Sequence, residues 1–252
     1  MTCAEIWGGT HLLTGSEDKT VVVWRTKDWV SLSTLRGHKN KVSALAVHPS
    51  GKLTLVSDTA GTMYLWNLTS AKCVFRHRTP ESSVLRWSPD GQTYASVHND
   101  KVEVSTTAAE TLCTLSPKSK GGDGSAGRVF DVAFVDDNVL LTGGEDRKLS
   151  AWDLRTGSDE TTAEGTGSLC TEPKESSAAL SSRVKAIKTF EVAGAKYCAA
   201  ASAQGSVAVY DLRRFGAEPV MTHDTRSRLT CMEAVATFEG ENDDDAEGTE
   251  GA

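Results

Sequence analysis

Residues 140–154 read LLTGGEDRKLSAWDL: two short apolar runs flank a polar turn, and the second run leads into a tryptophan. The same design returns at residues 12–24, LLTGSEDKTVVVW, with a Thr and an Asp at the same distances before the Trp. Weaker copies end near Trp66, Ser105 and Tyr210. A period of about 40 residues or more is typical of a repeat architecture, so we interpret the chain as five successive repeats.

Each repeat also has an apolar segment upstream of this pattern. Residues 42–47, VSALAV, are followed by a turn signal at residues 49–52, PSGK, and then by another apolar run. Three strands joined by turns, the third ending in an aromatic residue, and a fourth strand make one blade of a β-propeller. Such a sheet cannot bury both faces alone, so blades stack around an axis. The sequence therefore predicts an all-β propeller of five complete four-stranded blades plus a partial blade begun by residues 229–232, in an incomplete ring.

Three short motifs carry a family resemblance. GH at residues 37–38, WN at 66–67 and WD at 152–153 resemble the signature of WD40 repeats. In that family a His, a Ser or Thr, an Asp and a Trp form a buried hydrogen-bonded set within one blade. The positions that match are Thr14, Asp18, Trp24, His38, Trp66, Thr142, Asp146, Trp152 and Asp153. Two repeats match three of the four positions, and the second repeat matches only two because Val56 and Ala60 occupy the others. No blade has the full set, so we expect less rigidly locked blades. We also expect Trp24, Trp66 and Trp152 to be largely buried between adjacent blades.

Longer strings narrow the resemblance. Residues 29–68, 87–89, 202–212 and 227–231 resemble the p21-activated-kinase-interacting protein family. The resemblance implies a non-catalytic scaffold of the nucleus and nucleolus that acts in large ribosomal subunit biogenesis and pre-rRNA maturation, with ribosome assembly proteins and pre-rRNA as partners. It leaves open a second function, negative regulation of p21-activated kinase signalling through the kinase regulatory region. Members of that family have a further blade ahead of the position of Met1, so we expect a chain truncated at its N-terminus.

Charge divides the chain into two parts. Of the 34 acidic residues, seven lie within residues 239–252, which contain no Lys or Arg, and the remaining 27 equal the 27 basic residues. A run rich in Gly, Asp and Glu cannot bury enough apolar surface to fold. We therefore expect a propeller over residues 1–238, with flexible insertions at about 116–127 and 156–182, and a disordered acidic tail over residues 239–252. The tail is either a solvated segment or a ligand for a basic protein surface.

Motifs of catalysis and metal binding are missing from the sequence. It contains no GxSxG, HExxH or GxxxxGK[ST] motif, and its six cysteines form no CxxC pair. The six histidines are distributed among the repeats instead of clustering. We therefore predict that the protein is not an enzyme and binds no metal, cofactor or small-molecule substrate. No apolar run reaches the roughly 18 residues of a membrane-spanning helix, so no membrane partner is expected.

One pattern of charge points to a binding face. A basic residue stands immediately before the first strand of four repeats: Lys41, Arg128, Arg183 and Arg228. Equivalent positions in a propeller share one rim, so we expect these side chains to form an arc, with Lys39, Lys185 and Arg226 nearby. A basic arc on a neutral body suits an acidic protein surface or an RNA backbone. The alternative is that each cation pairs with a carboxylate of a neighbouring blade.

Overall fold

The structure, a computed structural model, describes residues 1–117, 127–155, 168–170, 175–176 and 180–233. Within these residues, alternating apolar segments form strands and the Gly-, Asp- and Pro-rich segments between them form turns, as their residue types favour. The acidic tail and most of the two predicted insertions lie outside the described residues.

The described strands form five sheets, which we number as blades 1 to 5. Blade 1 contains β1 (Cys3–Trp7), β2 (His11–Gly15), β3 (Val21–Arg25) and β4 (Val30–Leu35). Blade 2 contains β5 (Val42–Val47), β6 (Leu53–Asp58), β7 (Thr62–Asn67) and β8 (Lys72–Arg78). Blade 3 contains β9 (Val84–Trp87), β10 (Thr93–His98), β11 (Lys101–Thr106) and β12 (Thr111–Leu115), with β16 (Ser168–Cys170) parallel to β12. Blade 4 contains β13 (Val129–Asp136), β14 (Val139–Gly144), β15 (Leu149–Asp153) and β17 (Glu175–Ser176). Blade 5 contains β18 (Val184–Val192), β19 (Ala195–Ser202), β20 (Ser206–Asp211) and β21 (Met221–Asp224).

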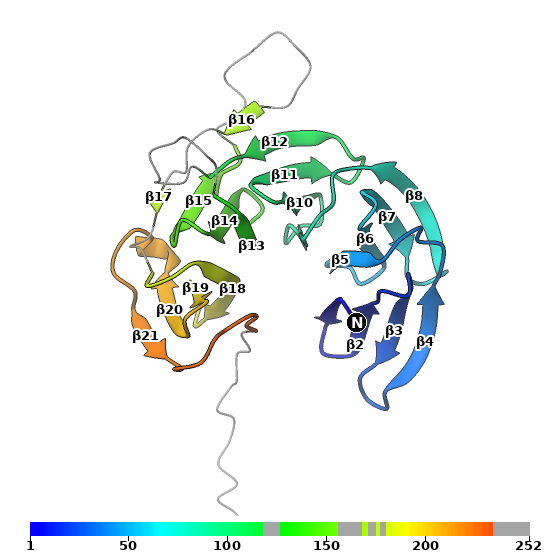
Figure 1. The fold of residues 1–252 in the computed structure, drawn as a ribbon, viewed down its shortest axis with the longest axis horizontal. Helices are drawn as coiled ribbons and strands as arrows, with labels where there is room; N and C mark the ends of the chain where they lie inside the picture. Colours follow the sequence, from blue (N-terminus) through cyan, green and yellow to red (C-terminus); the bar gives the residue numbers. More distant parts are fainter. Residues whose placement is uncertain (118–126, 156–167, 171–174, 177–179, 234–252) are drawn as a thin grey trace, which may run out of the picture.

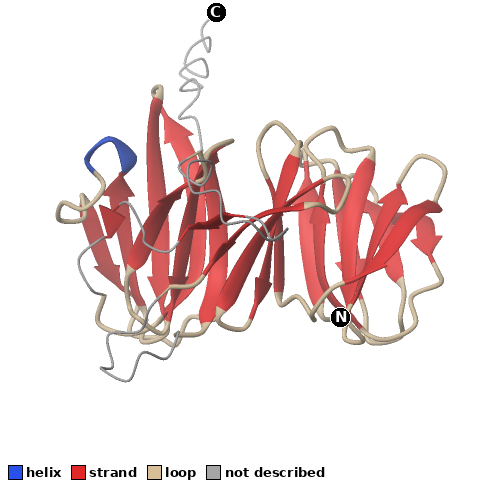
Figure 2. Cartoon of the chain, turned by 90° about the horizontal axis from the view of Figure 1, so that it is seen from above, coloured by secondary structure: helices blue, strands red, loops and turns tan. Residues whose placement is uncertain are grey.

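Figure 1 shows the five blades as an open arc, with blades 1 and 5 at its two ends and the first strand of each blade nearest the axis. Seen from the side, the strands cross the thickness of the arc and the loops gather on its two faces (Figure 2). The predicted all-β propeller with five complete four-stranded blades is confirmed. Helix in the described residues amounts to one 3-10 turn, Leu212–Arg214, and no described helix is long and apolar enough to cross a membrane.

The prediction of a partial sixth blade is wrong for the described residues. Residues 229–232 form no strand. A strand needs a partner for its backbone N–H and C=O groups, and no described strand is paired with this segment. The segment instead ends with an ion pair, in which the Glu233 carboxylate lies 2.7 Å from Lys188 Nζ of β18.

The apolar core lies between the blades. Four clusters of buried side chains fill the four interfaces between consecutive blades. Trp66 is 4% exposed in the interface of blades 1 and 2, and Trp152 is 1% exposed in the interface of blades 3 and 4. Trp24 is only half-buried, because its face of blade 1 lies at the end of the arc. The expectation that Trp24 packs between two blades is therefore wrong.

Two of the expected Trp–Thr pairs form hydrogen bonds. Trp24 Nε1 donates to Thr14 Oγ1 at 2.9 Å, and Trp152 Nε1 donates to Thr142 Oγ1 at 2.9 Å. Asp18 and Asp146 brace the following turns by accepting from the backbone N–H groups of Thr20 and Lys148. Asp153, the acid of the WD dipeptide, accepts from the Arg155 guanidinium and backbone N–H.

Blade 2 forms its set of buried hydrogen bonds with different residues. Trp66 Nε1 donates to His38 Nε2 at 3.0 Å, and His38 Nδ1 lies 3.0 Å from the carbonyl of Lys19. The carboxylate of Asp58 accepts from the Tyr64 hydroxyl and from two backbone N–H groups. Asp58 thus supplies the buried carboxylate that the repeat pattern places two positions later, where the chain has Ala60. Blade 2 is therefore locked by buried hydrogen bonds in spite of its departures from the repeat pattern.

Candidate binding surface

The four basic residues expected on one rim fall into two groups. Lys41, Arg128 and Arg183 stand immediately before β5, β13 and β18, the innermost strands of blades 2, 4 and 5. Arg228 follows β21 in a segment without regular structure. Blade 3 has Ser83 at the corresponding position, so an uncharged side chain separates Lys41 from the cations of blades 4 and 5 along this rim.

Lys41 is neutralised by a neighbouring blade. Its Nζ lies 3.0 Å from Glu17 Oε2, in the β2–β3 turn of blade 1. This contact also lowers the pKa of the Glu17 carboxyl. For Lys41 the structure therefore agrees with the alternative in which the cation pairs with a carboxylate beside it.

The other three cations converge on Lys185, the second residue of β18. Partial burial lowers the pKa of Lys185, and the positive charges of Arg183, Arg128 and Arg228 lower it further. Such an effect requires all three guanidinium groups to lie near the Lys185 ammonium. We call these four residues the basic cluster: Arg128, Arg183, Lys185 and Arg228.

Phe130 of β13 forms the floor of the basic cluster. Lys185 Nζ lies 3.5 Å from the centre of the Phe130 ring, and the guanidinium carbon of Arg128 lies 5.5 Å from it. The negative face of an aromatic ring attracts cations at these distances. Phe130 therefore helps to hold two like charges together, but the ring face under Lys185 is covered and offers no platform for a stacked base.

The basic cluster keeps its positive charge in the part of the chain that the structure describes. Within the described residues, none of its four members lies within ion-pair distance of a carboxylate. The charge of Glu145 opposes the lowering of the Lys185 pKa, and the Glu145 side chain accepts from the backbone N–H of Arg128. Arg128, Arg183 and Arg228 are all exposed. An anion at this rim would therefore relieve repulsion among cations that the fold holds together.

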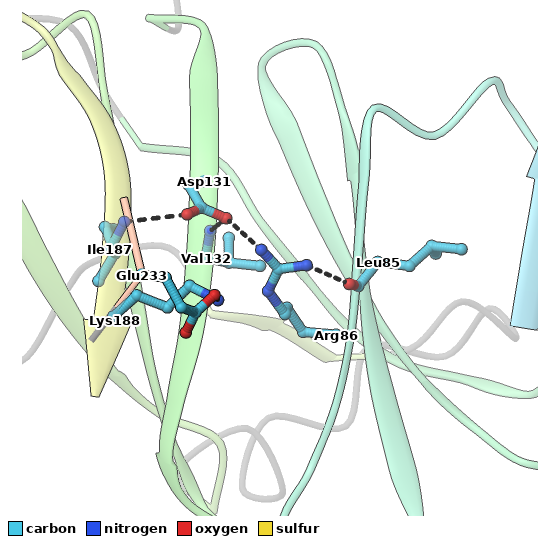
Figure 3. A network of polar contacts seen from close by, with 7 residues as sticks. All are labelled: Leu85, Arg86, Asp131, Val132, Ile187, Lys188 and Glu233. Atoms are coloured by element: carbon cyan, nitrogen blue, oxygen red, sulfur yellow. Dashed lines mark hydrogen bonds and ion pairs between the residues drawn. The ribbon is translucent and has the colours of Figure 1, made fainter. Parts of the chain in front are cut away.

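A second charged arrangement, which the sequence reasoning missed, braces the inner strands (Figure 3). Asp131 of β13 accepts at 2.9 Å from the backbone N–H of Ile187 in blade 5, and its other oxygen lies 3.3 Å from Arg86 Nη2 of blade 3. Arg86 also donates to the carbonyl of Leu85. Burial raises the pKa of Asp131, and the Arg86 charge acts in the opposite direction. One carboxylate thus links three consecutive blades.

Glu5 makes the corresponding link at the other end of the arc. Its Oε2 accepts at 3.1 Å from the backbone N–H of Val47 in blade 2. Glu5 also lines a cavity of about 300 Å³ at the axis, together with Arg86, Lys188 and Glu233. Burial raises the pKa of Glu5 to about 6. The signal in the sequence was a lone charged residue in an otherwise apolar inner strand.

The raised pKa of Glu5 predicts a pH-dependent stability. The folded chain holds the Glu5 proton more tightly than the unfolded chain, so this contribution to stability is complete below about pH 4.5 and is lost as the pH rises through about 6. Glu5→Gln keeps an acceptor for Val47 and carries no charge. At pH 7.5 we expect the variant to be up to about 2 kcal/mol more stable than the wild type, with the difference vanishing near pH 4. Urea unfolding at both pH values measures it; Glu110→Gln, at an exposed acid, is the control. A difference independent of pH would contradict the prediction.

One buried contact looks like part of a catalytic triad but has the wrong geometry. Ser96 Oγ lies 2.9 Å from His98 Nε2, and the Glu103 carboxylate lies 3.5 Å from the same nitrogen. In a triad the acid orients the opposite ring nitrogen, whereas His98 Nδ1 faces the carbonyl of Glu81. Ser96 is also 2% exposed, which closes it to a substrate. The described residues hold no cluster of three or more metal-ligating side chains.

Comparisons with known proteins agree with this architecture. The family model "WD domain, G-beta repeat" matches residues 5–25, 29–67 and 116–153. A p21-activated protein kinase-interacting protein 1-like protein of Danio rerio is 32% identical over 236 residues, which cover 92% of this chain and 58% of the relative. Pre-mRNA-processing factor 19 of Bos taurus is 31% identical over 148 residues, 57% of this chain and 29% of that protein. The β-propeller domain of Cps50 (Swd1) from Myceliophteria thermophila superposes with a TM-score of 0.66 at 18% identity, over 82% of this chain and 64% of the other. The chain thus spans little more than half the length of the kinase-interacting relative.

Proposed function

We propose that this WD40-repeat β-propeller protein is a non-catalytic scaffold in the maturation of the large ribosomal subunit and its pre-rRNA. The chain is related to the p21-activated protein kinase-interacting protein 1-like proteins. The observation that carries the proposal is the basic cluster on the rim of blades 4 and 5, where Lys185 and Arg128 lie over the Phe130 ring and the described residues place no carboxylate within ion-pair distance of the cluster. Exposed guanidinium groups form bidentate hydrogen bonds with phosphate oxygens, so the phosphate backbone of pre-rRNA is a suitable ligand. The proposal places the protein in the nucleolus, beside ribosome assembly proteins.

A second candidate function rests on the relatives. The name of the Danio rerio protein says that it interacts with a p21-activated kinase. If this chain shares that interaction, it would restrain the kinase by binding its regulatory region through the same rim. The two candidates differ in what the basic cluster recognises: a phosphate backbone in the first, and a protein segment in the second.

The cluster can be tested against a matched control. In the triple variant, Arg128→Ala, Arg183→Ala and Arg228→Ala remove the exposed guanidinium groups and leave Lys185 on Phe130. We expect its co-sedimentation with large-subunit precursors to fall at least about tenfold at low salt. The dependence of binding on salt should also flatten by about 0.7 for each single-strand phosphate that the protein no longer neutralises. Lys41→Ala, at the cation already neutralised by Glu17, should bind like the wild type.

Several outcomes would overturn the proposal. Exposed substitutions usually change stability by less than about 0.5 kcal/mol, so thermal unfolding should show that the triple variant folds. Unchanged precursor binding by a folded triple variant, at both a low and a high salt concentration, would remove the cluster from the function. A wild-type protein that does not co-sediment, but binds the regulatory region of a p21-activated kinase, would replace the first candidate with the second.

A further inference from the structure

The basic cluster and the acidic tail are two concentrations of opposite charge on this chain. The seven acids of residues 239–252 account for the whole net charge of −7, because the remaining acids and bases are equal in number. Within the described residues, the cluster carries four positive charges without an ion pair. Opposite charges of this size on one chain attract each other unless the chain keeps them apart.

The last described residue before the acidic tail lies close to the basic cluster. The Glu233 carboxylate lies 2.7 Å from Lys188 Nζ, so the last described residue is held against β18. Lys188 lies three residues after Lys185 on that strand, a distance of about 10 Å. The six-residue step from Glu233 to Glu239 reaches up to about 20 Å when extended. The first acids of the tail can therefore reach Lys185 without any change in the propeller.

We propose that residues 239–252 bind the basic cluster of the same chain and shield it from external polyanions. Each exposed ion pair is weak by itself, but the pairs act together on a tethered segment. A tether as short as the step from Glu233 to Glu239 would keep the tail at an effective concentration of about 1 mM. An external ligand must displace the tail, so only one with more charge or better geometry would occupy the rim. The inference concerns the surface used by the proposed function, and its test needs no ribosomal particle.

The test is a competition in which tail charge is the variable. In the neutral-tail variant each tail acid becomes its amide: Glu239→Gln, Glu241→Gln, Asp243→Asn, Asp244→Asn, Asp245→Asn, Glu247→Gln and Glu250→Gln. The probe is a fluorescein-labelled peptide with the wild-type sequence of residues 239–252, followed by fluorescence anisotropy at low salt. If the probe binds the free cluster with a Kd of about 100 µM, a tethered tail at about 1 mM should weaken its binding about tenfold. We expect the neutral-tail variant to bind the probe about tenfold more tightly than the wild type.

Two further arms make the result specific. Adding Arg128→Ala, Arg183→Ala and Arg228→Ala to the neutral-tail variant should abolish probe binding, whereas adding Lys41→Ala should leave it unchanged. Equal affinity of the wild type and the neutral-tail variant would overturn the inference and leave the cluster available to the proposed function. A probe that binds neither would also overturn it, and precursor co-sedimentation would still decide the proposed function separately.

Discussion

Replacing Trp152 with alanine is expected to lower the free energy of unfolding by about 3–5 kcal/mol. The indole is 1% exposed and packs in the cluster that joins blades 3 and 4, with Leu115 and Val97 among its members. Its removal leaves a cavity that close-packed sheets cannot fill, and it deprives Thr142 Oγ1 of its donor. Urea denaturation, with the slope unchanged from the wild type, measures the loss.

Trp24→Ala is the matched control for this prediction. Trp24 makes the same hydrogen bond, to Thr14, at the same step of its blade, but it is only half-buried. Solvent can occupy the space that its indole leaves, so we expect a loss of about 1–2 kcal/mol. If the two variants lost the same stability, a second surface would have to cover Trp24 in solution, and the protein would not be the open arc of five blades that we describe.

The repeat pattern predicted the fold because each blade is decided locally. Strand length, turn residues and the spacing of Thr and Trp all lie within one repeat, and together they fix a four-stranded sheet. The set in blade 2 escaped prediction because a buried carboxylate can be supplied from more than one backbone position. Asp58 ends β6 and reaches the Tyr64 hydroxyl, an arrangement that a fixed distance from Trp66 does not detect.

The binding surface was less predictable because it depends on contacts between blades. Glu17 and Glu145 occupy the same step of the β2–β3 and β14–β15 turns. Glu17 reaches across to Lys41 of the next blade, whereas Glu145 turns back to the Arg128 backbone of its own blade. Of these two contacts, only that of Glu17 with Lys41 neutralises a cation on the rim. The sequence pattern places both acids in equivalent positions and says nothing about which way each side chain turns.

The inner strands give a second case in which the sequence pattern cannot predict a contact between blades. A lone Asp in the run VFDVAF at residues 129–134 is compatible with a solvated side chain at the axis. Its burial follows from the two strands beside it, which come from blades 3 and 5 and lie 45 and 56 residues away along the chain. The energetic importance of Asp131 therefore becomes visible only when the blades are assembled.

Asp131→Ala is expected to cost about 3–5 kcal/mol of folding stability. The carboxylate is 5% exposed, and its removal leaves the N–H groups of Val132 and Ile187 without an acceptor and Arg86 without its counter-charge. Asp131→Asn should not restore stability, because both oxygens accept hydrogen bonds and an amide would turn its NH₂ group toward a donor.

Asp137→Ala separates the effect of burial from that of a hydrogen bond between blades. Asp137 also belongs to blade 4 and accepts from a backbone N–H of blade 3, that of Asp90 at 2.9 Å, but it is exposed. Water can replace it, so we expect a loss of at most about 1 kcal/mol. Urea unfolding of the three variants at pH 7.5 should rank Asp131→Ala and Asp131→Asn well below Asp137→Ala. Equal losses for Asp131→Ala and Asp137→Ala would show that the axis is hydrated, and that the inner strands are held together by the apolar layers between the blades and not by Asp131.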